Sequence, residues 1–219
     1  MSVVPQLLPL ELNSEIRKKQ ILTNIVKMLT NRKLLNKDNL EQNIKKFITQ
    51  ESNDNIYKIK LDFPEIYYED SDDKTYYIKL LYQKITGIAK SSNIGDFIYP
   101  RKNTPKLIVA TGITGKALQQ LKTDFLNSEV FTEDELMINL VDHVAVPKHE
   151  ILSDEDAKLM MADYILKKRE LPKIFINDPV SKYFNAKLGQ IFRIIRPSEL
   201  AGESVYYRIV IKGSSDDKK

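Results

Sequence analysis

The chain opens with two segments in which apolar residues recur at helical spacing. This spacing predicts a helix over residues 14–31 with Ser14 as its N-cap. It predicts a second helix over about 38–50, where Asp38 and Glu41 have the form of a capping box. We expect the two helices to form a hairpin. The apolar positions behind these predictions are Ile21, Leu22, Ile25, Met28 and Leu29, then Leu40, Ile44, Phe47 and Ile48.

The hydrophobic period then changes to two, which is typical of half-buried strands. Residues 57–63 alternate apolar and charged side chains, and residues 75–81 are rich in β-favouring types. The acidic tract 69–73 between them is expected to be a solvated turn rather than a cation site. Residues 106–110 have the composition of a short buried strand, and a helix is predicted over about 116–126.

From about residue 136 the pattern changes again. Ser153 and Asp156 form a capping-box variant that predicts a helix reaching about Tyr164. Asp178 followed by Pro179 predicts a second helix start. The predicted strands are 190–195 and 205–211, joined by a turn over 197–202.

Together these patterns predict an α+β protein in two parts. The chain has 219 residues, enough for one large domain or two small ones. We expect a mixed α/β domain over 1–137, a smaller α+β domain over 138–212 and a disordered tail over 213–219. The boundary is inferred from the change of pattern, because the sequence has no low-complexity linker.

Composition narrows the classes of chemistry. The absence of cysteine excludes disulfides, a thiolate nucleophile, Cys-ligated zinc and iron–sulfur clusters. No apolar run reaches the roughly 20 residues of a membrane helix, and no basic residue precedes the apolar N-terminus, so we expect an intracellular, non-secreted protein. The net charge is +4, divided equally between the parts before and after Met137. Neither part of the chain is therefore a concentrated basic domain of the kind that binds nucleic-acid phosphates nonspecifically.

Residues 107–117 resemble a phosphate-binding loop, with an apolar run, two glycines and Lys116. A Walker loop needs four residues between its first Gly and the Gly-Lys pair, and a Ser or Thr after the Lys. Only two residues intervene here, and Ala117 follows the Lys. An ordinary strand-to-helix turn is the favoured interpretation, although such a turn can touch a DNA phosphate.

The remaining candidates do not make an active site. His143 and His149 are separated by a segment containing Pro147 and lack a third metal ligand, so hydrogen-bonded structural roles are favoured. Arginines at 193, 196 and 208 accompany Tyr206 and Tyr207, a combination found at protein interfaces and on nucleic-acid-binding sheets. We favour the interface, and a binding or assembly component over an enzyme.

A longer set of motifs runs through the C-terminal third: 139–149, 153–155, 171–174, 178–180, 189–190, 194–199, 201–202 and 207–208. In order and spacing these motifs resemble the H-type small subunit of multisubunit DNA-directed RNA polymerases, whose eukaryotic form is the fifth subunit shared by polymerases I, II and III.

Further motifs lie in the N-terminal part: 27–32, 40–47, 107–109 with Thr114 and Ala117, then Phe131 and 135–136. They resemble the jaw domain of the eukaryotic form, weakly so over about 50–100.

Departures from the family pattern concentrate at a few positions. Gly115 and Lys116 stand where the family has Pro and Ser, Lys33 where it has Gly, and Ser181-Lys182 where it has Ala-Arg. With the Lys, Ile and Asn bias, these changes suggest a divergent lineage, first a large DNA virus and second an AT-rich eukaryote. Localisation would be the virion and host cytoplasm in the first case and the nucleus in the second.

The resemblance implies a noncatalytic polymerase subunit with no cofactor and no bound metal. The jaw would lie beside downstream duplex DNA, which Thr114, Gly115 and Lys116 would approach weakly and without reading sequence. The C-terminal assembly domain would dock on the largest subunit, near small subunit six, in a hetero-oligomer without membrane contact. The alternative is a free-standing transcription-regulatory scaffold that kept the subunit fold. The interface residues implied are His143, Pro147, Lys148, His149, Pro172, Asp178, Pro179, Arg196, Ser198, Glu199, Tyr207 and Arg208.

Overall fold

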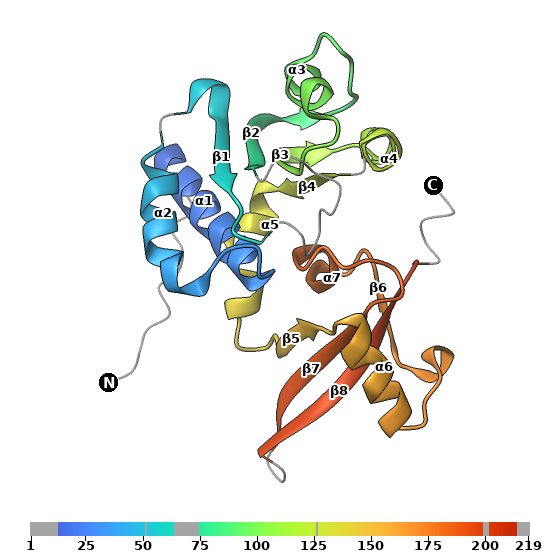
Figure 1. The fold of residues 1–219 in the computed structure, drawn as a ribbon. Helices are drawn as coiled ribbons and strands as arrows, with labels where there is room; N and C mark the ends of the chain where they lie inside the picture. The colour runs from blue at the N-terminus through green and yellow to red at the C-terminus, as the bar shows by residue number, and fades with distance from the viewer. Residues whose placement is uncertain (1–12, 51, 64–74, 126, 199–201, 214–219) are drawn as a thin grey trace. The chain divides into compact units, whose positions relative to one another are not determined.

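The computed structural model describes residues 13–50, 52–63, 75–125, 127–198 and 202–213 (Figure 1). The predictions for the N-terminus, the acidic turn 69–73, Glu199 and residues 214–219 of the predicted tail lie outside these residues. The chain divides into two compact units, Met1–Ile138 and Asn139–Lys219. Among the helices of the described ranges, none is both long and apolar enough to cross a bilayer.

The first unit is built on a mixed sheet of order β1-β2-β3-β4. Strand β1 (Ile56–Lys60) is antiparallel to β2 (Thr75–Ile85). Strands β3 (Lys106–Ile113) and β4 (Ser128–Thr132) continue the sheet in parallel. Parallel neighbours need crossover connections, which here contain α3 (Asn93–Ile98) and α4 (Gly115–Asp124).

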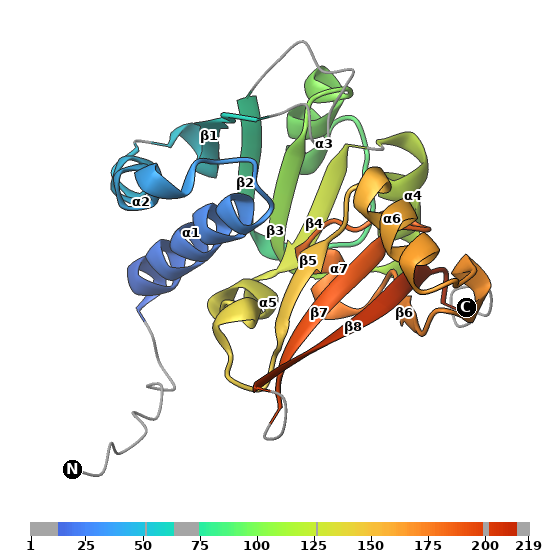
Figure 2. The ribbon, with the colours of Figure 1, turned by 60° about the horizontal axis from the view of Figure 1, so that its bottom comes forward.

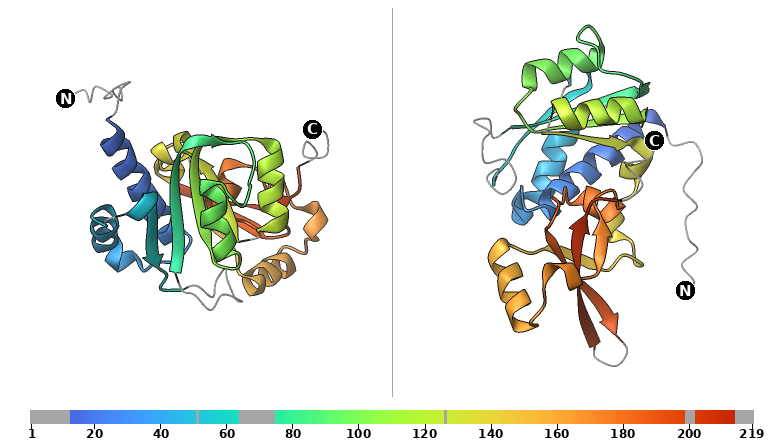
Figure 3. Two further views of the ribbon diagram at one scale, coloured as in Figure 1. Left: turned by 90° about the horizontal axis from the view of Figure 1, so that it is seen from above. Right: turned by 90° about the vertical axis from the view of Figure 1, so that its right-hand side faces the viewer.

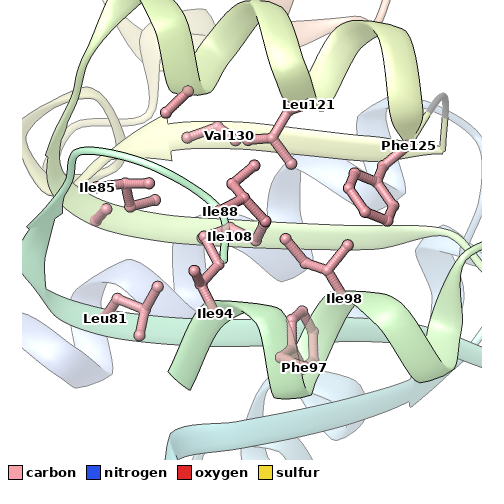
Figure 4. Close-up of a cluster of buried hydrophobic side chains, with 12 residues drawn as sticks. Leu81, Ile85, Ile88, Ile94, Phe97, Ile98, Ile108, Leu121, Phe125 and Val130 are labelled. Carbon is pink, nitrogen blue, oxygen red and sulfur yellow. The ribbon is translucent and has the colours of Figure 1, made fainter. Parts of the chain in front are cut away.

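Helices cover both faces of this sheet, as Figure 1 and the left panel of Figure 3 show. On one side α1 (Ser14–Asn31) packs against α2 (Leu40–Ile48) and α5 (Glu133–Met137), which confirms the predicted helical hairpin. On the other side α3 and α4 close a core with the sheet, drawn in Figure 4. Phe97 of α3, Ile108 of β3 and Leu121 of α4 meet there, each at most 1% exposed.

The helix starts differ from the predictions in detail. The N-cap of α1 is Asn13, not Ser14, because the Asn13 side chain accepts the Glu15 amide. The predicted capping box at Asp38 is absent: the Asn36 side chain accepts the Asp38 amide and starts a short 3₁₀ turn, Lys37–Asn39, before α2. A full capping box does form at Thr132, ahead of α5, and was not predicted.

The second unit is a sheet of order β5-β7-β8-β6 with one helix on each face. Strands β7 (Ile191–Ser198) and β8 (Gly202–Ile211) form an antiparallel hairpin flanked by β5 (Lys148–Ile151) and β6 (Lys173–Phe175). Figure 2 shows this hairpin extending past α6 (Asp154–Asp163). Helix α6 packs on Ile191 and Ile209, whereas Phe184, the C-cap of α7 (Pro179–Tyr183), packs on Phe192.

Both predicted helix starts of this unit are confirmed. The Ser153 side chain accepts the Asp156 amide at the start of α6. The side chain of Asp178, the residue before Pro179, accepts the Val180 amide at the start of α7. The hairpin strands are longer than predicted, because Pro197 and Ser198 continue the pairing with β8. Among the described residues, short 3₁₀ segments also occur at Asn53–Asn55, Tyr99–Arg101, Leu140–Asp142 and Lys168–Glu170.

Candidate functional site

The predicted DNA-proximal residues occupy the junction between β3 and α4. Thr114 is the N-cap of α4, and its hydroxyl accepts the Ala117 amide at 3.5 Å. The same hydroxyl donates to the Thr86 carbonyl at 3.0 Å, and the Thr114 amide donates to the Ile85 carbonyl at 3.0 Å. The junction is therefore fixed to the end of β2 rather than free to move.

Gly115 and Lys116 are exposed at this junction. The Lys116 ammonium has no ion-pair partner among the residues that the structure describes. Strand β3 runs through Gly112 to Ile113, so a single residue, Thr114, connects the strand to the helix. This connection is too short for a loop that wraps phosphates, which agrees with the favoured strand-to-helix turn. What remains is an exposed cation at the first turn of a helix.

A second set of predicted residues meets on the α7 face of the second unit. His149 of β5 is half-buried, with its ring edge-to-face to Phe192 at 5.8 Å. Its Nδ1 donates to the Pro147 carbonyl at 2.7 Å, which leaves Nε2 as the acceptor of the neutral ring. Burial lowers the pKa of His149, so the neutral ring is favoured.

Charged groups from three further elements act on this histidine. The carboxylate of Asp178 raises the pKa of His149, whereas the guanidinium groups of Arg208 and Arg196 lower it. The strand register explains why the two arginines share this face: Arg208 pairs with Phe192, and Arg196 lies four residues beyond Phe192. The charge environment of His149 on β5 is thus set by Asp178, the N-cap of α7, and by Arg196 of β7 and Arg208 of β8. We call these four residues the cluster around His149.

Arg196, near the end of the β7–β8 hairpin, also contacts an aromatic ring. Its guanidinium carbon lies 4.7 Å from the centre of the Tyr206 ring, a cation–π geometry. Both side chains are exposed, and Val205 beside Tyr206 is 41% exposed. The ends of the hairpin therefore present arginine, tyrosine and apolar surface, the composition that protein interfaces favour.

Other predicted interface residues fall elsewhere. Tyr207 is on the opposite face, where it packs near α6 and its ring lies 5.9 Å from that of Tyr164. Pro172 accepts the Ile209 amide and fixes the start of β6. His143 is exposed, and its Nδ1 accepts the Ala145 amide. Lys148 pairs with Glu150 at 2.7 Å. These residues do not join the cluster around His149.

One buried polar residue at the start of this unit was missed by the sequence reasoning. Asn139 is 8% exposed, and its Oδ1 accepts the Tyr183 hydroxyl at 2.8 Å. The bond ties the segment before the Leu140–Asp142 turn to α7. No pattern predicted it, because the two residues are 44 positions apart. Within the described ranges, no group of three or more His, Asp or Glu side chains is arranged to hold a metal ion.

Comparison with known proteins matches this unit to a family. Residues 138–210 match the family model described as RNA polymerase Rpb5, C-terminal domain. The chain is 49% identical over 74 residues to the DNA-directed RNA polymerase subunit Rpo5 of Methanosarcina acetivorans, which is 34% of this chain and 95% of the archaeal protein.

Two longer relatives extend the match beyond the second unit. The subunit RPABC1 of DNA-directed RNA polymerases I, II and III from Caenorhabditis elegans is 40% identical over 107 residues. This match covers 48% of the chain and about half, 51%, of the nematode protein. The DNA-directed RNA polymerase subunit 5 of Acanthamoeba polyphaga mimivirus is 33% identical over 133 residues, 60% of this chain and 63% of the viral protein.

Proposed function

Because this chain belongs to the RNA polymerase Rpb5 family, we propose that it is a noncatalytic subunit of a DNA-directed RNA polymerase. The observation that carries the proposal is the match of the second unit to nearly the whole archaeal subunit, 95% of its length. A module that makes up nearly the whole of an archaeal polymerase subunit supports a function in assembly with other polymerase chains. Nucleotide addition would belong to those larger chains.

In this proposal the second unit is the assembly domain. Its docking surface would be the cluster of His149, Asp178, Arg196 and Arg208 together with the exposed end of the hairpin. Arg and Tyr at such a surface are the side chains that dominate binding at protein interfaces. The partners would be the largest polymerase subunit and, near it, small subunit six, giving a hetero-oligomer.

The first unit would act as a jaw beside the downstream DNA duplex. Lys116 is exposed at the first turn of α4, where the positive end of the helix dipole adds to its charge. A single cation of this kind suits a weak contact with the phosphate backbone that does not depend on base sequence. The larger subunits would supply most of the positive field. The protein would work in the nucleus if its polymerase is eukaryotic or, for a viral polymerase, in the virion and host cytoplasm.

Co-purification tests the proposal directly. The full chain, tagged and expressed in its native cell or infection, is expected to be recovered in a stoichiometric complex with the two largest polymerase subunits. Recovery of the chain alone, or in a complex free of polymerase subunits, would contradict the proposal and favour a free-standing regulatory scaffold. The identity of the recovered large subunits also distinguishes a viral polymerase from a nuclear one.

A further inference from the structure

A cavity lies beside α6 in the second unit. Its volume of about 340 Å³ falls at the lower end of the roughly 300–1,000 Å³ typical of ligand sites. One side of α6 forms one wall, and the end of β5 and the turn that leads into β7 form the other. None of the residues that the family resemblance implied for the subunit interface lines it.

The floor of the cavity is apolar. Ala157 and Ile191 are 8% and 1% exposed, and the half-buried side chains of Leu152 and Met161 flank them. Methionine is flexible and adapts its shape to what packs against it. The floor can therefore receive apolar side chains of a partner without a change of fold.

The rim of the cavity carries two lysines, Lys158 and Lys168. Both are exposed, and neither has an ion-pair partner within the described part of the chain. The one acidic residue in the lining, Asp154, lies in the first turn of α6, where the helix dipole stabilises a carboxylate. Because two lysine ammonium groups outnumber one carboxylate, the rim has a net positive charge, which favours an acidic partner.

The length of the cavity wall along α6 suits a short extended peptide. The lining positions on α6 run from Asp154 to Met161, about 10 Å at 1.5 Å per residue. An extended chain covers that length with about three residues at roughly 3.3 Å each. In an extended chain successive side chains point to opposite sides, so apolar residues can enter the groove while acidic neighbours remain near the lysines.

We propose that this cavity, a groove between α6 and residues 189–191 at the start of β7, binds an extended segment of a protein partner. In that segment apolar residues alternate with Asp or Glu. The groove would be a second attachment point on the assembly unit, separate from the cluster around His149. The apolar side chains would occupy the floor at Ala157 and Ile191. The acidic side chains would pair with Lys158 and Lys168.

Peptide binding to the full chain tests this proposal without any polymerase present, so its outcome is independent of co-purification. The probe is a fluorescein-labelled peptide of alternating Leu or Phe and Asp or Glu, followed by fluorescence polarisation. We expect binding that weakens as salt rises, because exposed charges are screened. A peptide with Lys for every acid, and one with Ser for every Leu or Phe, are each expected to bind about tenfold more weakly, or about 1.4 kcal/mol.

Two protein variants locate the binding. The double variant Lys158→Glu, Lys168→Glu is expected to bind the acidic peptide about tenfold more weakly. The matched control Lys45→Glu, Lys46→Glu makes the same charge change at exposed positions of α2 and is expected to bind like the unmodified chain. Methyl NMR signals of Met161 and Ile191 are expected to shift on peptide addition.

Three results would overturn the proposal. Tighter binding of the lysine peptide would indicate a basic partner. Binding of octanoate in place of the peptide, with the same methyl shifts, would indicate an acyl ligand. Unshifted Met161 and Ile191 methyls with saturating acidic peptide would show that this groove is not the site.

Discussion

Arg32 and Glu129 form two parallel hydrogen bonds, of 2.8 and 2.7 Å, between the C-cap of α1 and strand β4. The Arg32 side chain is fully buried, and the two residues are 97 positions apart. The hydroxyl of Tyr76 on β2 donates to the same carboxylate at 2.9 Å. The carboxylate therefore links one helix end to two strands of the first unit.

Replacing Glu129 with Ala is expected to reduce the free energy of unfolding by about 3–5 kcal/mol, because it removes the carboxylate that makes two hydrogen bonds to the buried Arg32 guanidinium. Tyr76→Phe removes one hydrogen bond to the carboxylate and is expected to cost about 1 kcal/mol. Urea unfolding measures both changes. The double variant Arg32→Met, Glu129→Leu is expected to lose less than Glu129→Ala alone, and a larger loss would contradict this account of the pair.

Lys106 at the start of β3 predicts a pH dependence of stability. Its side chain is fully buried and its ammonium donates to the carbonyls of Arg101, Lys102 and Thr104. Burial, together with the nearby charge of Arg101, lowers the pKa of Lys106 from 10.5 to about 8. Between these two pH values the unfolded chain binds the extra proton, so the free energy of unfolding is expected to rise as pH rises from about 8 to 10.5.

Comparison with Lys106→Met isolates this effect. The methionine variant is expected to be less stable at pH 7, because three carbonyls lose their donor. It is also expected to lack the rise in stability between pH 8 and 10.5. Chemical unfolding at several pH values measures the difference between the two proteins, and parallel curves over this range would argue against a titrating Lys106.

Ile165 after α6 adopts a φ of 54°, in the left-handed region, and is 90% exposed. A β-branched residue is strained there, at a cost of roughly 1–2 kcal/mol. We expect Ile165→Asn to raise the free energy of unfolding by about 1 kcal/mol in urea unfolding, since Asn tolerates this conformation. Val144→Asn makes a comparable polarity change at a fully exposed residue that does not have a positive φ. It is expected to change the free energy of unfolding by less than about 0.5 kcal/mol.

The proposed jaw contact predicts a modest effect at one lysine. Lys116→Ala is expected to weaken the contact with downstream DNA without changing assembly, because Lys116 is exposed and has no partner in the described part of the first unit. Photo-crosslinking from position 116 in the assembled complex is expected to reach duplex DNA ahead of the active centre. Crosslinks to protein alone would refute the contact. Lys122→Ala, at an exposed position in the last turn of α4, is the matched control.

The proposed assembly surface predicts a larger effect at Arg196. Arg196→Glu replaces a cation stacked on Tyr206 by an anion, and an unpaired charge at a buried interface costs about 2–5 kcal/mol. Its yield in the co-purified complex is expected to fall accordingly. Arg17→Glu makes the same substitution at an exposed position of α1 and is expected to leave the yield unchanged. Equal yields for both variants would remove Arg196 from the docking surface.

Local chemistry explains which elements the sequence could predict. The caps at Ser153 and Asp178, the long apolar pattern of α1 and the β7–β8 hairpin depend on neighbours in sequence, and all were predicted. Strands β4, β5 and β6, of three to five residues, were missed, because their sequences lack the alternation of apolar and charged residues that predicted the equally short β1. They exist through pairing with distant strands.

Only some residues of the candidate site could likewise be placed from local sequence. Lys116 could be placed at a helix start from sequence, since strand, Thr and helix follow one another there. The clustering of His149 with Asp178 and Arg208 depends on strand order and register, which no local pattern encodes. Tyr207 is separated from this cluster although it is adjacent to Arg208 in sequence, because successive side chains of a strand point to opposite faces of the sheet.

The order β5-β7-β8-β6 places the last strand of the sheet in its interior. During synthesis β6 therefore has no strand to pair with until residues 209–211 have left the ribosome. The first unit, whose sheet is complete at residue 132, can fold while the second is still being translated. A ribosome stalled before β8 would release a chain with one finished unit and one open sheet edge, a substrate for chaperones and proteases.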